Sequence, residues 1–140
     1  MGNRAIIKSE KSNIGVYLHW NGGVDSVEAF LEYCKLRGFR DFEDGYGIAR
    51  FCQVVGNWFG GDLSIGVCEC TATTDAEAEE YWLDNGVYVI NSKWEIVQRL
   101  DANSHREGYD RIEFLIDIDS KQPEKDRLGE ETIRKMKQGE

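Results

Sequence analysis

The stretch Tyr17-Leu-His-Trp-Asn-Gly-Gly-Val-Asp-Ser-Val-Glu28 joins a predicted strand to a predicted helix. The apolar, β-branched run from Ile14 to Leu18 ends at a polar and aromatic turn, and a helix pattern begins after two glycines. Glycines at such a junction allow a positive φ and the close approach of a ligand or a second chain. A similar corner follows at Asn57-Trp-Phe-Gly-Gly61. The two aromatic–glycine corners favour a binding surface over a catalytic centre.

The periodicity of the remaining segments predicts an α+β fold. Helix patterns cover residues 46–58 and a segment that starts at an Asp25 or Ser26 cap and closes at Gly38. Strand patterns cover residues 3–9, 14–20, 63–68, 86–90, 94–99 and 112–118. Because the helices are grouped between strands, we expect a mainly antiparallel sheet with two helices packed on one face.

The domain organisation follows from length and charge. Residues 1–120 are predicted to form a single α+β domain, and residues 121–140 a charged tail with few apolar residues. Within this tail, Ile133 and Met136 could anchor a short helix over residues 130–137. Disorder and packing on a partner subunit are the alternatives.

The formal charge of −9 for 140 residues argues against direct binding to nucleic acid, which needs clustered Lys and Arg. The sequence has neither a membrane-spanning apolar run nor a signal peptide, so a cytoplasmic protein without membrane association is expected. The cysteines fall on predicted helix and strand faces rather than in zinc-binding pairs, and we expect no metal and no cofactor. These four residues are Cys34, Cys52, Cys68 and Cys70.

The aromatic corners supply the first candidate ligand residues. At the first corner, Trp20 would stack on a ring and Asn21 would supply hydrogen bonds. A tight turn whose tryptophan completes the core explains the same residues equally well. At the second corner, Trp58 and Phe59 are consecutive and cannot both face one core, so one of them is expected in a pocket or interface, beside Asn57.

A second group of candidates lies in the loop before residue 112. Arg106 and Arg111 flank Tyr109, and arginine is suited to bidentate phosphate recognition. Salt bridges to the many acidic residues are the commoner explanation for such arginines. No nucleophile is spaced to pair with His19 or His105, so the sequence gives no catalytic residues.

The sequence resembles small proteins encoded by phages and prophages of Gram-positive bacteria. The resemblance is carried by Gly15-Val-Tyr-Leu-His-Trp-Asn-Gly-Gly-Val-Asp-Ser-Val-Glu-Ala-Phe-Leu31, by Tyr46-Gly-Ile-Ala-Arg50 and by Cys52-Gln-Val-Val-Gly-Asn-Trp-Phe-Gly-Gly61. Small phage proteins of this size often counter host defence, and two kinds fit. One is a sponge of the Thoeris anti-defence type, and the other is an acidic anti-CRISPR protein. The resemblance implies no particular site residue and, for a phage protein, a location in the host cytoplasm.

Together these observations lead to one hypothesis and one alternative. The hypothesis is a non-enzymatic, homo-oligomeric protein that sequesters a nucleotide-derived small molecule, such as a cyclic nucleotide or an ADP-ribose-like signal. The alternative is an acidic inhibitor that docks on the basic groove of a nucleic-acid-binding host defence nuclease.

Overall fold

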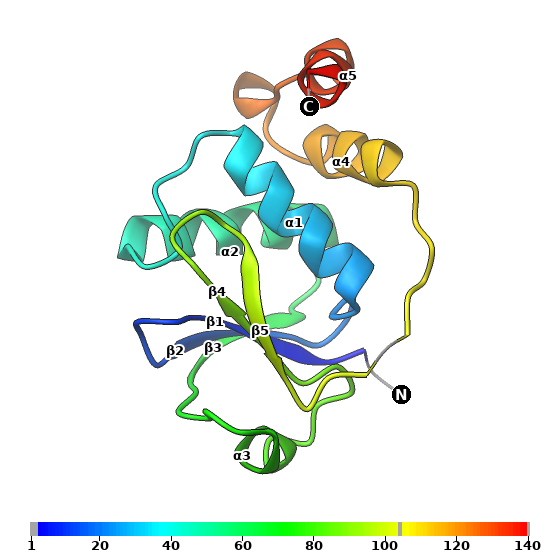
Figure 1. Cartoon of the computed structure of the whole chain (residues 1–140). Coiled ribbons are helices and arrows are strands. Elements are labelled where there is room, and N and C mark those ends of the chain that lie inside the picture. Colours follow the sequence, from blue (N-terminus) through cyan, green and yellow to red (C-terminus); the bar gives the residue numbers. More distant parts are fainter. Residues whose placement is uncertain (1–2, 104, 140) are drawn as a thin grey trace.

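The computed structural model describes residues 3–103 and 105–139 and confirms the α+β class (Figure 1). In chain order, its elements are β1 (Ala5–Ser9), β2 (Ile14–Leu18), α1 (Val24–Leu36), α2 (Gly45–Phe59), β3 (Ile65–Glu69), α3 (Asp75–Glu79), β4 (Val87–Ile90), β5 (Ile96–Leu100), α4 (Arg111–Ser120), the 3-10 turn η1 (Glu124–Asp126) and α5 (Glu130–Gln138). Among these residues, no helix is long and apolar enough to cross a membrane.

The five strands form one mixed sheet in the order β3-β2-β1-β4-β5. The pairs β1–β2, β2–β3 and β4–β5 are antiparallel, which confirms the mainly antiparallel sheet and both predicted hairpins. The central pair β1–β4 is parallel. It joins the two hairpins into one sheet, with β3 and β5 at the outer edges.

The helices are arranged in more layers than the sequence predicts. Helices α1 and α2 lie on one side of the sheet, α3 lies on the other, and α4 and α5 lie beyond α1 (Figure 1). The main core contains residues of β1 and β2 together with Phe30 of α1 and Val55 of α2. The prediction of just two helices on one face is therefore not confirmed, because the described chain contains five α-helices.

The N-cap of α1 differs from the expected residue, whereas α2 ends at an expected glycine. Neither Asp25 nor Ser26 caps α1, because the N-cap is Gly23. The Asp25 carboxylate lies in the first turn of α1 and instead accepts a hydrogen bond from the backbone N–H of Gly108. Helix α2 begins at the Asp44 cap, and Gly60, with a φ of 68°, ends it as the glycine pattern predicts.

The strand predicted over residues 112–118 is wrong, because this segment forms α4. Its alternating apolar residues resemble a strand, but α4 packs against both α1 and α5 and so buries apolar residues on more than one side. The Asp110 side chain caps the helix by accepting from the backbone N–H of Glu113. Asp119, near the C-terminal end of α4, is buried.

Asp119 connects the C-terminal segment to α1 through hydrogen bonds. It accepts hydrogen bonds from the Tyr33 hydroxyl at 2.6 Å and from the backbone N–H groups of Leu128 and Gly129. Ile133 of α5 is fully buried in the main core. The short helix predicted for the tail is therefore present, and it packs on α4 of its own chain.

Candidate functional site

Trp58, a candidate from the second corner, packs α2 against α1 and α4. Its ring stacks on Phe114 with centroids 5.5 Å apart and meets the edge of Phe30 at 5.4 Å. Its indole N–H donates to a carboxylate oxygen of Asp117 at 2.9 Å. The neighbouring ring of Phe59 contacts Trp58 at 5.2 Å. These contacts place both rings of the second corner in an aromatic seam between helices.

The first corner combines an accessible ring with a tightly packed backbone. Trp20 is 40% exposed and meets the His19 ring edge-on. Asn21 has a positive φ of 56° and donates to the Ser26 hydroxyl. A Cβ on Gly22 would lie 2.5 Å from the carbonyl oxygen of Asn3, so packing against the start of the sheet requires this glycine.

The two candidate arginines are held by carboxylates of α1. Arg106 contacts Asp25 at 2.8 Å and Glu28 at 3.1 Å. Arg111 reaches Glu28 and Glu32, both at 2.8 Å. The salt-bridge interpretation of these arginines thus agrees with the structure, and their charges are already neutralised.

Tyr109 lies beside the same seam. Its ring contacts Phe114 at 5.1 Å, and its hydroxyl donates to Glu107. The hydrogen bond to Glu107, together with burial, raises the pKa of Tyr109 to about 12. Phe114 therefore contacts both Trp58 and Tyr109, and Phe59 joins the same seam through Trp58.

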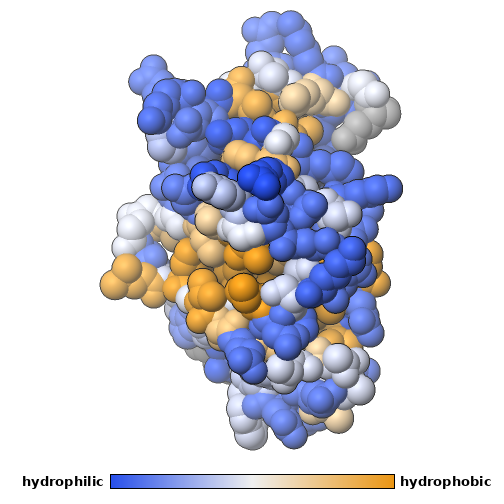
Figure 2. Space-filling model, turned by 90° about the vertical axis from the view of Figure 1, so that its left-hand side faces the viewer, coloured by the Kyte–Doolittle hydropathy of each residue, from blue (hydrophilic) through white to orange (hydrophobic). Residues whose placement is uncertain are grey.

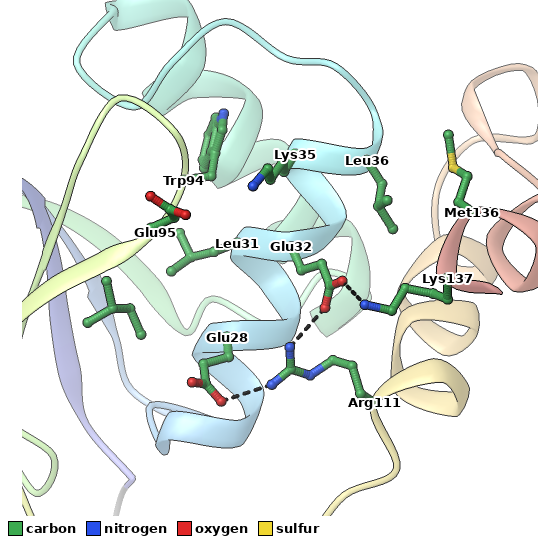
Figure 3. Close-up of a pocket in the computed structure, with 11 residues that line it drawn as sticks. Glu28, Leu31, Glu32, Lys35, Leu36, Trp94, Glu95, Arg111, Met136 and Lys137 are labelled. Carbon is green, nitrogen blue, oxygen red and sulfur yellow. Dashed lines mark hydrogen bonds and ion pairs between the residues drawn. The ribbon is translucent and has the colours of Figure 1, made fainter. Parts of the chain in front are cut away.

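A first groove, the hairpin groove, opens between α1, the β4–β5 hairpin and α5, with a volume of about 650 Å³. Figure 3 shows Arg111 reaching Glu28 and Glu32 across this groove, with Lys137 on the other side of Glu32. Burial acts to raise the pKa of Glu32, but the hydrogen bonds and charges of Lys137 and Arg111 lower it overall. The lining has equal numbers of acidic and basic side chains: Glu28, Glu32, Glu95, Lys35, Arg111 and Lys137. Such a balanced groove gives no net attraction for an anion.

A second groove, the arginine groove, lies where the end of α1 meets α2 and η1, with a volume of about 380 Å³. This volume is within the range of small-molecule sites, roughly 300–1,000 Å³. Its lining combines two arginines and one acid with amides and apolar groups: Arg37, Phe39, Arg50, Gln53, Val54, Asn57, Gln122, Pro123 and Asp126. Asn57, predicted at the second corner, is thus the one ligand candidate that lines it.

The arginines of this groove donate hydrogen bonds to neutral side chains. Arg37 donates to the Tyr33 hydroxyl at 3.2 Å, and its guanidinium lies 4.9 Å from the Phe39 ring centroid. Arg50 donates to the side-chain oxygen of Gln53 at 2.6 Å and lies over the ring of Tyr46. Within residues 3–103 and 105–139, neither arginine has a carboxylate within ion-pair distance.

The amides of the groove are held in fixed orientations. Asn57 donates to the side-chain oxygen of Gln122 at 2.9 Å. Gln122 in turn donates to the carbonyl oxygens of Val54 and Ile118. This network joins α2 to the end of α4, so the groove wall is preorganised.

The sequence analysis selects none of Arg37, Phe39 and Arg50 as a ligand residue. One signal was available for Arg50, because no acidic residue lies three or four positions away on its helix. The proximity of Arg37 to Arg50 depends on the packing of α1 against α2, which sequence spacing does not reveal.

Two other reactive side chains are His19 and Cys34. His19 shares a hydrogen bond with the Tyr17 hydroxyl at 2.8 Å. Burial raises the pKa of the Cys34 thiol, which disfavours the nucleophilic thiolate. In the part of the chain that the structure describes, no three His, Cys, Asp or Glu side chains are grouped for metal binding.

The fold and the two grooves define a small α+β protein with a cationic groove on an otherwise acidic body. The chain matches no protein-family model, and comparisons with curated proteins and with solved structures give no match.

Proposed function

We propose that the protein is a non-enzymatic binding protein that captures a small nucleotide-derived molecule in the arginine groove. The observation that carries this proposal is the pair Arg37 and Arg50 in a chain of net charge −9. Both line one groove, and among residues 3–103 and 105–139 neither has a carboxylate within ion-pair distance. An acidic protein that binds an anion must leave some positive charge unneutralised at the site.

The groove offers complementary partners for each part of such a ligand. The guanidinium groups of Arg37 and Arg50 suit bidentate contacts to phosphate oxygens. A phosphate would displace the neutral acceptors Tyr33 and Gln53, which costs less than breaking an ion pair. Phe39 and the amide of Asn57 would contact the ring and its polar edge.

The biological role within this proposal is sequestration of a cyclic-nucleotide or ADP-ribose-like defence signal. It rests on the resemblance to small phage proteins described above. A protein that only removes a signal needs a site that binds tightly and leaves the ligand unchanged, and the groove presents cations, amides and a ring without a nucleophile–base pair.

The first test is a thermal shift assay with a panel of nucleotides, cyclic nucleotides and ADP-ribose derivatives. A ligand at a hundredfold excess over its Kd adds about 2.7 kcal/mol of stability, so binding is readily detected. We expect one compound to raise the Tm and to be recovered unchanged after denaturation. A consumed compound would mean an enzyme, and no shift with any compound would refute nucleotide binding.

The matched variants are Arg50→Gln in the groove and Arg134→Gln on α5. Both remove one positive charge, but Arg134 lies outside the groove and contacts Glu113 and Glu130. Arg50→Gln should weaken ligand binding by about tenfold or more, the loss expected for a charge-assisted phosphate contact. Equal losses of affinity in the two variants would show that binding depends on the net charge of the protein and not on the arginine groove.

A second candidate function, the acidic inhibitor of a nucleic-acid-binding nuclease, is favoured by the surface around α3. Helix α3 exposes Asp75, Glu77 and Glu79, and Trp82 follows with 80% of its surface exposed. An exposed tryptophan among acids suits an arginine-rich protein surface. This function predicts affinity for a basic protein that falls steeply with salt and is lost in Trp82→Ala, with nucleotide binding unaffected.

A further inference from the structure

Lys8 of the central strand β1 is a buried cation. It is 6% exposed, although a lysine side chain is rarely buried unless it is paired. Its ammonium group donates one hydrogen bond, to the carbonyl oxygen of Cys70 at 3.0 Å. Among residues 3–103 and 105–139, no carboxylate lies within ion-pair distance of it. Because an ammonium group has three donors, two of them remain without an acceptor in the described chain.

A cavity of about 490 Å³ lies beside Lys8. Val89 of β4 pairs with Lys8, and Gln98 of β5 pairs with Val89, so the three residues form one row across the sheet. Ala72 and Thr73, which precede α3, line the same cavity. Ala72 and Val89 belong to the apolar cluster that contains Ala78 of α3. The cavity therefore lies on the α3 face of the sheet, opposite to α1 and α2 (Figure 1).

A β-bulge in β5 adds a second side chain to this lining. Val89 pairs with Gln98 whereas Ile90 pairs with Ile96, so Val97 is the extra residue. Consecutive residues of a regular strand point to opposite faces, but a bulge redirects a side chain, and Val97 lines the cavity together with Gln98. In the part of the chain that the structure describes, the side-chain amide of Gln98 has no hydrogen-bond partner.

The charges around the cavity select the class of anion. Glu10 also lines it, and the hydroxyl of Thr73 donates to Glu77 of α3. Figure 2 shows mainly hydrophilic residues at the end of the molecule where Figure 1 places α3. A single ammonium group near these carboxylates favours one negative charge over two. The apolar side chains of Val89 and Val97 favour a ligand with an apolar body.

We propose that the cavity beside Lys8 binds a small monocarboxylate with an apolar body. The carboxylate accepts hydrogen bonds from the Lys8 ammonium group and the Gln98 amide, and the apolar body contacts Val89 and Val97. The ligand thus supplies the counter-ion that the described chain lacks and offsets the cost of a buried, unpaired charge. This site does not depend on the proposed nucleotide function, because the arginine groove lies between α1, α2 and η1.

The first experiment titrates the isotope-labelled full chain with sodium butyrate and follows its backbone amide resonances by NMR. Acetate, phosphate and chloride are titrated in parallel at equal ionic strength. We expect saturable shifts at Ala72, Val89 and Gln98, and tighter binding of butyrate than of acetate because butyrate buries more apolar surface. No saturable shift with either carboxylate would mean that water alone solvates Lys8 and would overturn the proposal. Phosphate binding as tight as that of butyrate would contradict the monocarboxylate class.

The role of Lys8 is tested with two lysine variants. Lys8→Met removes the charge but keeps an unbranched apolar side chain, and loss of a buried, unpaired charge should not prevent folding. Its Kd for butyrate should rise about tenfold or more, the loss expected for a charge-assisted hydrogen bond. Lys11→Met is the matched control, because Lys11 is exposed and pairs with Glu43 at 3.5 Å, and it should leave the Kd unchanged. Equal affinities of Lys8→Met and the unmodified protein would refute the site.

A carboxylate introduced into the lining provides a test without added ligand. Gln98→Glu keeps the size of an exposed side chain and places a carboxylate at the cavity. It should raise the Tm by pairing with Lys8 and should weaken butyrate binding by competition. In the Lys8→Met background, the same substitution should not raise the Tm. An equal change of Tm in both backgrounds, or unchanged butyrate binding in Gln98→Glu, would contradict a carboxylate site between Lys8 and Gln98.

Discussion

Two pairs of arginines show how the same residue type serves different purposes in this molecule. Arg106 and Arg111 lie where the start of α4 meets α1, and carboxylates of α1 neutralise both. Arg37 and Arg50 lie where the end of α1 meets α2, and their hydrogen bonds to described residues go to the neutral groups of Tyr33 and Gln53. The first pair joins helices, whereas the second keeps its charge available. The identity of the partner decides whether an arginine is structural or can bind a ligand.

The tryptophans of the two glycine corners differ in a similar way. Trp58 lies against Phe30 and Phe114 in the seam between helices, whereas Trp20 meets the ring of His19 and is 40% exposed. The aromatic–glycine pattern alone does not distinguish them. Mutations in the two regions should separate stability from binding.

The largest effect is expected from Trp58→Ala. Removing the indole leaves the seam between α1, α2 and α4 underpacked, and we expect a loss of about 2–4 kcal/mol, below the value for a fully buried tryptophan. Urea unfolding monitored by circular dichroism measures it. Trp20→Ala is the matched control and should cost less than about 1 kcal/mol. Similar losses in both variants would refute a structural role specific to Trp58.

An effect smaller than that of Trp58→Ala is expected from Arg111→Gln, for which Arg50→Gln is the matched comparison. Arg111 bridges two carboxylates, so its loss should cost roughly 1–2 kcal/mol, above the ~0.2–1 kcal/mol of an exposed pair. Arg50→Gln should change the free energy of unfolding by less than about 0.5 kcal/mol but should weaken the binding of the proposed nucleotide ligand. If Arg50→Gln destabilises the fold as much as Arg111→Gln, the proposed division between the two arginine pairs fails.

The segments with local signals were predicted well from the sequence. Both hairpins have polar turns between β-branched runs, and α2 has an apolar stripe and a closing glycine at Gly60. Helix α4 was misassigned because alternation at Ile112, Phe114 and Ile116 fits a strand, while burial by two neighbouring helices allows the same residues in a helix. Local pattern fails where tertiary packing supplies more than one apolar neighbour.

The candidate site was predicted only in part for the same reason. Asn57 was selected and lines the arginine groove, and salt bridging was foreseen as the alternative for Arg106 and Arg111. The carboxylate partners of Arg106 and Arg111 lie more than 70 positions away along the chain, whereas Arg37 and Arg50 donate to near neighbours, Tyr33 and Gln53. Spacing along the chain carries no information about distant carboxylates or about which helices pack together, so the meeting of Arg37 and Arg50 in one groove could not be predicted by sequence alone.

The smallest effect concerns the pH dependence of the neutralised pair. Because the folded-state pKa of Glu32 is below its ordinary value of 4.5, its stabilising contribution is present above that pH. This contribution is lost as the pH falls through the lowered pKa.

Glu32→Gln should cost less than about 1 kcal/mol at neutral pH, since the amide oxygen still accepts hydrogen bonds. Urea unfolding of both proteins between pH 7 and the acid range should show the difference shrinking below pH 4.5. A difference that stays constant with pH would mean that the ion pair with Arg111 and Lys137 adds nothing beyond hydrogen bonding, and the first arginine region would lose its electrostatic explanation.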